Sequence, residues 1–352
     1  MKSKHIGLIL LLLTIGGIAV YSLLIVPKTK LTSIDGYLGG EKIGLFEDEK
    51  FAKIMKKNGL EVTYSKAGSL DMVRSSHEGR NYLFPSSQTA LDYYISQHGK
   101  PLQSEIIFNT PIVLYTWSMV SDALIKDGLV KDNNGILTVD MLEMVKYIEQ
   151  DTSWKDLGLP ELYGNLSIQT THPAKSNSGN MFAGLLANSL IGGEVVNEST
   201  VGSILPRLKR VFEKIGYMES SSADLFSQFL KTGVGAKPII VGYESQLLEF
   251  SKERPESFEK VKDKIKIIYP TPTVWSSHIY IALTDEGKRA TEVLMGEDIQ
   301  RLAWEEHGYR TGVAGGEQDT SIFGVSGVEK SVTRIIPMPD YKTMEKIINT
   351  LQ

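Results

Sequence analysis

Short apolar runs alternate with amphipathic stretches along most of this chain. In the first third, runs bounded by Gly, Pro or Ser predict strands over 42–46, 60–64 and 82–85. Between and after them, apolar residues at three- and four-residue spacing predict helices over 48–57, 69–76 and 87–98. Strands that alternate with helices in this way favour a mostly parallel sheet covered by helices on both faces.

A long β-rich run over 105–117 contains Pro111, which disfavours a central strand but suits a strand that crosses between two bodies. The stiff stretch 270–273, with two prolines, predicts the return crossing. The other predicted strands are 165–168, 238–241, 265–269 and 278–283, and the other predicted helices are 118–129, 139–150, the apolar helix that ends at 190, 200–216, 223–232, 246–251, 285–294, 297–308 and 340–351. This order predicts two lobes with a cleft between them.

The pattern predicts a two-lobed α/β fold with two crossing hinge strands, preceded by one transmembrane helix. Residues 1–30 are predicted to form a signal-anchor or transmembrane segment and its flank, and 31–40, with three glycines, are predicted to be a tether. The first lobe comprises 41–116 and 271–352, and the second comprises 117–270.

The N-terminus predicts a membrane segment. Lys2 and Lys4 precede an uncharged run over 6–26, which begins at Ile6, ends at Val26 and as a helix would span about 30 Å. The run lacks a small-residue cleavage site and favours an uncleaved anchor in the cell membrane, with a cytoplasmic N-terminus and an extracytoplasmic globular part. Cleavage of a signal peptide, followed by secretion, is the alternative.

Composition narrows the possible functions. The 352 residues carry a formal net charge of −4, so they show no basic footprint for nucleic acid. The chain has no cysteine, which excludes disulfides, cysteine metal sites and a lipid-modified cysteine. No phosphate-binding, dinucleotide-binding, HExxH or GxSxG motif is present, which favours a protein that is not an enzyme and predicts no metal and no cofactor. A hydrolase whose Ser, His and acid meet only in space is a less favoured alternative.

Candidate ligand-binding residues lie in loops that follow predicted strands. The loop 172–180 leads into the apolar helix, and its Ser and Asn side chains and its glycine could cradle an anion with the free N–H groups of the helix start. The same side chains could simply cap the helix. In a later loop, the Tyr243 hydroxyl could contact ligand, or Tyr243 could be a core residue. Glu244 could likewise hold a ligand amine or cap the following helix. The predicted ligand-binding set is Gly68, Ser69, Ser86, Ser87, Ser176, Asn177, Ser178, Gly179, Tyr243 and Glu244.

Four segments carry a family resemblance: Ala67-Gly68-Ser69, the loop from His172 to Gly179, Gly242-Tyr243-Glu244-Ser245, and the stretch from Trp304 to Arg310. Together with the order of elements over 40–340, they resemble the type II periplasmic solute-binding proteins of ABC importers, in the molybdate- and sulfate-binding-like branch. The chain is also similar to the solute-binding regions found beside von Willebrand A domains.

The resemblance implies reversible capture of a small-molecule or ion ligand in an interlobe cleft, by a monomer that works with a membrane permease. Glu47 and Asp48 stand where oxyanion binders of this branch carry Ser or Thr, which leaves a neutral, cationic or mixed-charge ligand open. A tethered sensor or scaffold that uses the same fold for protein–protein interaction is the alternative function. This alternative would be favoured if Glu47 and Glu244 fill the cleft with unpaired acids.

Overall fold

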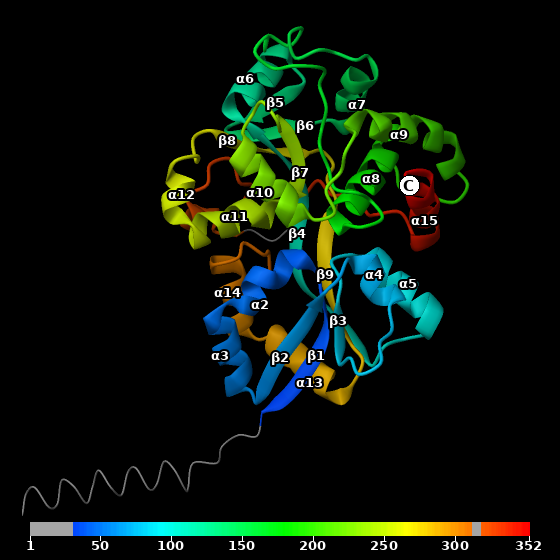
Figure 1. The fold of residues 1–352 in the computed structure, drawn as a ribbon, viewed down its shortest axis with the longest axis vertical. Coiled ribbons are helices and arrows are strands. Elements are labelled where there is room, and N and C mark those ends of the chain that lie inside the picture. Colours follow the sequence, from blue (N-terminus) through cyan, green and yellow to red (C-terminus); the bar gives the residue numbers. More distant parts are fainter. Residues whose placement is uncertain (1–30, 312–317) are drawn as a thin grey trace, which may run out of the picture.

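The computed structural model describes residues 31–311 and 318–352, which form two α/β lobes joined by strands (Figure 1). The predicted membrane segment over 6–26 lies outside the described residues. Among the residues that are described, no helix is long and apolar enough to cross a membrane.

The first lobe is built on a sheet with the strand order β2-β1-β3-β9-β4. β1, β2 and β3 are parallel, whereas β9 runs antiparallel to both β3 and β4. The sheet is therefore mixed rather than mostly parallel. Its strands are β1 (Thr32–Leu38), β2 (Leu60–Lys66), β3 (Tyr82–Phe84), β9 (Trp275–Ala282) and the first half of β4 (Gln103–Trp117).

Helices cover both faces of this sheet (Figure 1). α3, α4, α5, α13 and α14 agree with the predicted helices to within a few residues, and Asp48 caps α3 by accepting a hydrogen bond from the Lys50 N–H. The helices of this lobe are η1 (Gly40–Lys42), α2 (Ile43–Glu47), α3 (Glu49–Lys57), α4 (Ser69–Arg74), α5 (Gln88–His98), α13 (Asp285–Leu294) and α14 (Glu297–Glu305).

β4 confirms the predicted crossing strand. Its first half pairs with β9, and its second half pairs with β7 and β8 of the other lobe. Pro111 lies near the changeover, opposite Trp275, where β9 also begins. The chain returns between the end of β8 at Pro270 and this start of β9, as the two prolines predicted. The lobes are thus joined through adjacent segments of extended chain.

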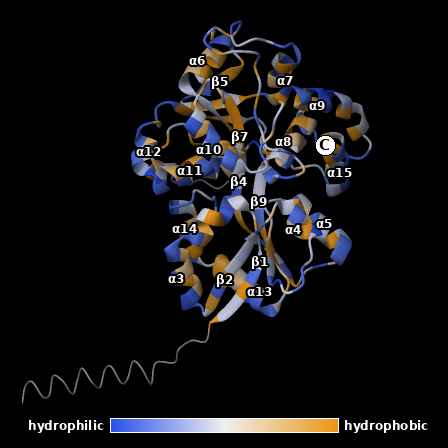
Figure 2. Ribbon diagram, in the orientation of Figure 1, coloured by the Kyte–Doolittle hydropathy of each residue, from blue (hydrophilic) through white to orange (hydrophobic). Residues whose placement is uncertain are grey.

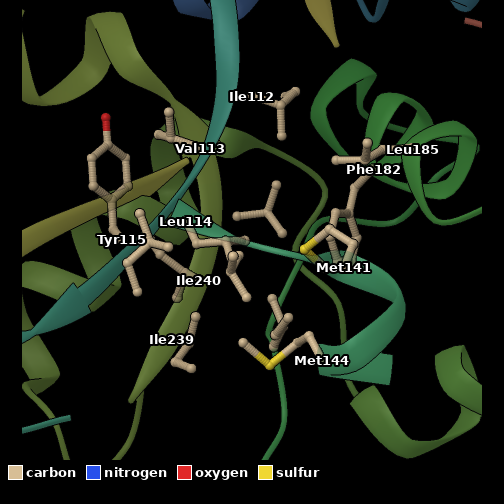
Figure 3. Packing of buried hydrophobic residues seen from close by; sticks show 14 of the residues in the cluster. Ile112, Val113, Leu114, Tyr115, Met141, Met144, Phe182, Leu185, Ile239 and Ile240 are labelled. Carbon is tan, nitrogen blue, oxygen red and sulfur yellow. The ribbon is translucent and has the colours of Figure 1, made fainter. Parts of the chain in front are cut away.

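The second lobe surrounds the second half of β4. Figure 3 shows side chains of β4 and β7 meeting Met141 and Met144 of α7 and Phe182 and Leu185 of α8. Apolar residues gather on the inner sides of the helices and along the strands, and polar residues on the outer sides (Figure 2). The elements of this lobe are α6 (Ser118–Asp127), β5 (Val130–Asn133), β6 (Ile136–Val139), α7 (Met141–Glu149), α8 (Asn177–Leu190), α9 (Val201–Ile215), α10 (Ser222–Thr232), β7 (Ile239–Tyr243), α11 (Glu244–Glu253), α12 (Pro255–Glu259), β8 (Ile265–Pro270), η2 (Thr320–Phe323) and α15 (Tyr341–Thr350).

Two predictions around the first strand are wrong. Residues 31–40 are not a tether, because Thr32–Leu38 form β1 in the middle of the sheet. Gly36 weakens the strand pattern in the sequence, because glycine is unusual inside a strand. A glycine is required at this position, since a Cβ would lie 2.6 Å from the ring of Tyr82. The predicted strand over 42–46 is instead helical, as the end of η1 and α2.

The second lobe brings two further corrections. The predicted strand over 165–168 is absent: Asn165 forms an isolated bridge with Ser153, and Gln169 forms one with Ile240. The hairpin formed by β5 and β6 was not predicted. The prediction placed all of 271–352 in the first lobe. However, Met344, Ile347 and Leu351 are buried in the core of the second lobe, because α15 packs on α8 and α9.

Candidate ligand-binding cleft

A cleft of about 290 Å³ lies between the lobes. The first lobe contributes the loops that follow β1 and β2, and the second contributes the loops that precede α8 and α10. The lining residues are Gly39, Gly40, Glu41, Lys66, Ala67, Gly68, Ser69, Asp71, Lys175, Ser176, Asn177, Ser220, Ser221 and Ser222. Each lobe therefore supplies one wall, which is the arrangement required if closure is to depend on a ligand.

The wall from the second lobe contains two helix starts. α8 begins at Asn177 and α10 at Ser222, and in both helices the N-cap serine is extended and accepts no side-chain capping hydrogen bond. The first N–H groups of a helix have no partner within the helix and lie at the positive end of its dipole. Backbone donors from two helices thus border the cleft.

The lobes touch at this cleft. A Cβ on Gly68, in the first lobe, would lie only 2.9 Å from the carbonyl oxygen of Lys175 in the second lobe. The Asn177 side-chain amide donates across the interface to the backbone oxygen of Ser86 at 2.8 Å, and it lies 3.2 Å from the Tyr243 hydroxyl. The structure therefore represents a closed arrangement of the lobes.

Four of the predicted residues line the cleft: Gly68, Ser69, Ser176 and Asn177. Ser69 is nevertheless buried, and its hydroxyl accepts a hydrogen bond from the backbone N–H of Ser86 at 2.9 Å. Its structural role is to join the loop after β2 to the loop after β3.

Four other predicted residues lie behind the walls of the cleft. Ser86, Ser178 and Tyr243 are buried, and the Ser178 hydroxyl is 2.7 Å from that of Thr171. A Cβ on Gly179 would come within 2.0 Å of the Thr171 carbonyl, so this glycine allows α8 to pack closely on the preceding chain. These residues support the cleft from behind.

Ser87 and Glu244 lie away from the cleft. Ser87 borders a separate, mostly apolar cavity of about 400 Å³ beside Trp275. Glu244 is fully buried, and its carboxylate accepts hydrogen bonds from the Arg310 guanidinium at 2.7 and 2.9 Å and from the Tyr269 hydroxyl. The structure therefore gives Glu244 an internal partner.

A buried ion pair at the floor of the cleft was not predicted. Glu41 follows β1 and lines the cleft, and one of its carboxylate oxygens lies 2.5 Å from the Lys42 Nζ, whose side chain is fully buried. The Ser86 hydroxyl also donates to this carboxylate. The sequence signal for this pair is Gly39-Gly40-Glu41-Lys42 directly after a strand, and it is visible only when 32–38 is recognised as that strand.

Electrostatics keep the Glu41 carboxylate charged. Burial alone would raise the pKa of Glu41, but the Lys42 ammonium and the hydrogen bond from the Ser86 hydroxyl lower that pKa to about 2. Burial and the Lys42 charge hold the pKa of His278 well below its usual value, so this imidazole is neutral. Burial lowers the pKa of Lys42 and the Glu41 charge opposes this, and the 2.5 Å contact between the two side chains identifies them as an ion pair.

A second polar contact joins the lobes beside the cleft. His307 lies between Glu249 of α11, whose Oε1 is 2.6 Å from Nδ1, and Asp48, whose Oδ2 is 3.3 Å from Nε2. Glu249, Glu253 and His307 offer donor atoms within 4.8 Å of one another and could in principle hold a metal ion. Because carboxylates already contact both ring nitrogens, an ion-pair network accounts for this cluster.

Glu47, the acid that the sequence analysis placed near the ligand, lies at the end of α2. Its carboxylate accepts a hydrogen bond from the Tyr64 hydroxyl at 2.7 Å on an exposed surface of the first lobe. The acid in the loop after the first strand is Glu41, since that strand is β1.

Comparison with solved structures shows the fold. The chain is similar to the substrate-binding protein of an ABC transporter from Agrobacterium tumefaciens, with 15% identity, a TM-score of 0.58, and coverage of 93% of this chain and 96% of that chain. It is also similar to the periplasmic binding protein AfuA from Actinobacillus pleuropneumoniae with fructose-6-phosphate bound, with 12% identity, a TM-score of 0.55, and coverage of 91% and 96%.

A third similar structure is FutA (IdiA) from Trichodesmium in complex with iron and citrate, with 11% identity, a TM-score of 0.54, and coverage of 91% and 97%. No family model and no curated protein matches the sequence. The chain therefore has the two-lobed mixed α/β fold of the solute-binding proteins of ABC transporters. At these identities the likeness establishes the fold and leaves the ligand open.

Proposed function

We propose that this protein is an extracytoplasmic solute-binding protein that captures a small ligand between its lobes and delivers it to an ABC-type permease. The observation that carries this proposal is the 290 Å³ cleft, because its walls come from both lobes and its hinge segments are extended strands. A ligand that contacts both walls binds the closed form better than the open one and so shifts the protein toward closure.

The charges of the cleft favour a polar ligand. Lys66, Lys175 and Asp71 line it together with Glu41, and the uncapped starts of α8 and α10 add backbone donors. The Glu41 charge is already balanced by Lys42, so the free charges in the lining are two ammonium groups and one carboxylate. This combination suits a ligand that carries both an anionic group and a hydrogen-bonding or cationic group.

The membrane anchor remains part of the proposal. The uncharged run over 6–26 would hold the binding lobes at the outer surface of the cell membrane, close to the permease. We also propose that the protein acts as a monomer and catalyses no reaction, in line with the binding role of the structurally similar proteins. The sensor or scaffold alternative is less favoured, because Glu41 is paired with Lys42 and Glu244 with Arg310, and the cleft remains open.

A thermal-shift screen of the full-length protein tests the proposal. The panel contains oxyanions, amino acids, sugars, sugar phosphates, polyamines and metal ions, and a ligand should raise the melting temperature by mass action. The double variant Asn177→Ala/Ser178→Ala should weaken the response to any hit more than the control Lys262→Ala/Lys264→Ala does. If no compound stabilises the wild type, or if both double variants respond equally, the proposed function or the assigned cleft is wrong.

A further inference from the structure

The Glu41 carboxylate lies beside polar side chains from three separate segments, two of which, Lys42 and Ser86, donate to it. Lys42 follows it directly, Ser86 lies in the loop after β3, and His278 lies in β9. The Lys42 Nζ is 2.6 Å from the Ser86 hydroxyl and 3.2 Å from His278 Nδ1, in addition to its contact with Glu41. Since an ammonium can only donate, Nδ1 of the neutral His278 accepts, and the remaining negative partner of Lys42 is Glu41.

The same carboxylate separates this donor group from the cleft. Glu41 lines the cleft, whereas the side chains of Lys42 and His278 are fully buried, as is Ser86. Within the described part of the chain, the protonated Nε2 of His278 has no hydrogen-bond partner, so the group has more donors than acceptors. The Glu41 side chain, which lines the cavity, is therefore in direct contact with a buried ammonium that does not line it.

We propose that Glu41 is a built-in anion that fills the anion position beside Lys42 in the cleft, so that small oxyanions are excluded there and the other lining residues select the ligand. This inference deepens the proposed function and rests on it only in treating the cleft as the ligand site. A buried ammonium that loses its partner is strongly destabilising, so any small carboxylate that reaches the vacated position is bound to compensate the charge.

The variant Glu41→Ala tests this directly with acetate as the probe. The substitution removes the side chain beyond Cβ, and acetate supplies a methyl carbon and a carboxylate of matching size. Isothermal titration should show acetate bound to Glu41→Ala at least about tenfold more tightly than to the wild type, and acetate should raise the melting temperature of the variant. Equal acetate responses of the variant and the wild type would overturn the proposal.

Two controls isolate the role of Lys42. Asp71→Ala removes another carboxylate that lines the same cleft and should gain no affinity for acetate. Glu41→Ala/Lys42→Met removes both charges and should lose the acetate response. An acetate response that persists in this double variant would contradict the proposal.

Folding of the single variant does not decide the outcome by itself. If Glu41→Ala is unfolded in chloride buffer, it should refold when acetate is added, while Glu41→Ala/Lys42→Met should fold without acetate. Failure of acetate to restore the fold, when the double variant is folded, would overturn the inference. These results are independent of the ligand screen on the wild type, so the inference and the proposed function can fail separately.

Discussion

Two buried glutamates, Glu41 and Glu244, show how the same side chain serves different purposes in the two lobes. Both follow a strand directly or within a short loop, and both are paired with a basic residue. Glu244 is enclosed at the junction of the lobes, where two guanidinium nitrogens and the Tyr269 hydroxyl fix its oxygens. Glu41 is paired with a lysine at the floor of the cleft and borders the cavity. Both glutamates are paired with a basic residue, so the difference between them is that Glu41 borders the ligand cavity and Glu244 does not. Only an acid that borders the cavity can influence which ligand binds.

The largest expected effect is on stability, at Glu244. Glu244→Ala would leave the Arg310 guanidinium buried without its carboxylate, which should cost about 3–5 kcal/mol in the free energy of unfolding. Urea denaturation measures this cost. Glu41→Ala should cost less, because solvent or a small anion can reach the Lys42 ammonium through the cleft. A loss at Glu41 equal to or larger than that at Glu244 would remove the distinction between the two glutamates.

The next largest effect is expected on ligand affinity, at Gly68. In Gly68→Val the new side chain would collide with the Lys175 carbonyl, which lies 2.9 Å from the position of a Cβ, and would hold the lobes apart. Affinity for a ligand found in the screen should fall about tenfold or more, with little change in unfolding free energy. Gly202→Ala is the matched control, because a Cβ there meets nothing within 4 Å. Unchanged affinity in Gly68→Val would show that ligand binding does not need this closure.

The smallest effect concerns pH. Burial lowers the pKa of His307, but the hydrogen bonds and charges of Glu249 and Asp48 outweigh it and raise that pKa above its ordinary value. A raised pKa stabilises the folded state fully below the unfolded value of about 6.5, and this contribution is lost as pH rises through the folded value.

The unfolding free energy of the wild type should therefore decrease by about 1 kcal/mol more than that of His307→Gln between pH 6 and pH 9. Denaturation curves at a series of pH values measure the difference. Parallel pH profiles of the two proteins would show that the contact between His307 and the acids of both lobes adds no stability.

The sequence pattern predicted most of the helices and the crossing strand, because apolar periodicity and the position of Pro111 are local signals. It failed at β1, where Gly36 occupies the inward position between the buried Ile34 and Leu38 and so interrupts the apolar alternation. Because the first strand is β1 and not 42–46, the acid in the loop that follows it is Glu41 rather than Glu47.

The candidate site was predictable only in part, for a related reason. Gly68, Ser69, Ser176 and Asn177 follow strands or begin helices, and such positions are visible in sequence. The partner of Glu244 is not visible, because Arg310 is distant in the chain and only the fold brings the two together. Which acid lines the cleft therefore depends on contacts between residues that are distant in the chain, and these contacts are known only from the fold.

The most direct test of ligand capture between the lobes is a distance measurement across the cleft. The chain has no cysteine, so Lys57→Cys and Lys209→Cys, at exposed positions of α3 and α9, can carry a pair of spin labels. Double electron–electron resonance should show a broad distribution that includes longer distances without ligand, and a single narrower distribution with the best compound of the screen. Identical distributions with and without a compound that binds would contradict closure of the lobes on a ligand.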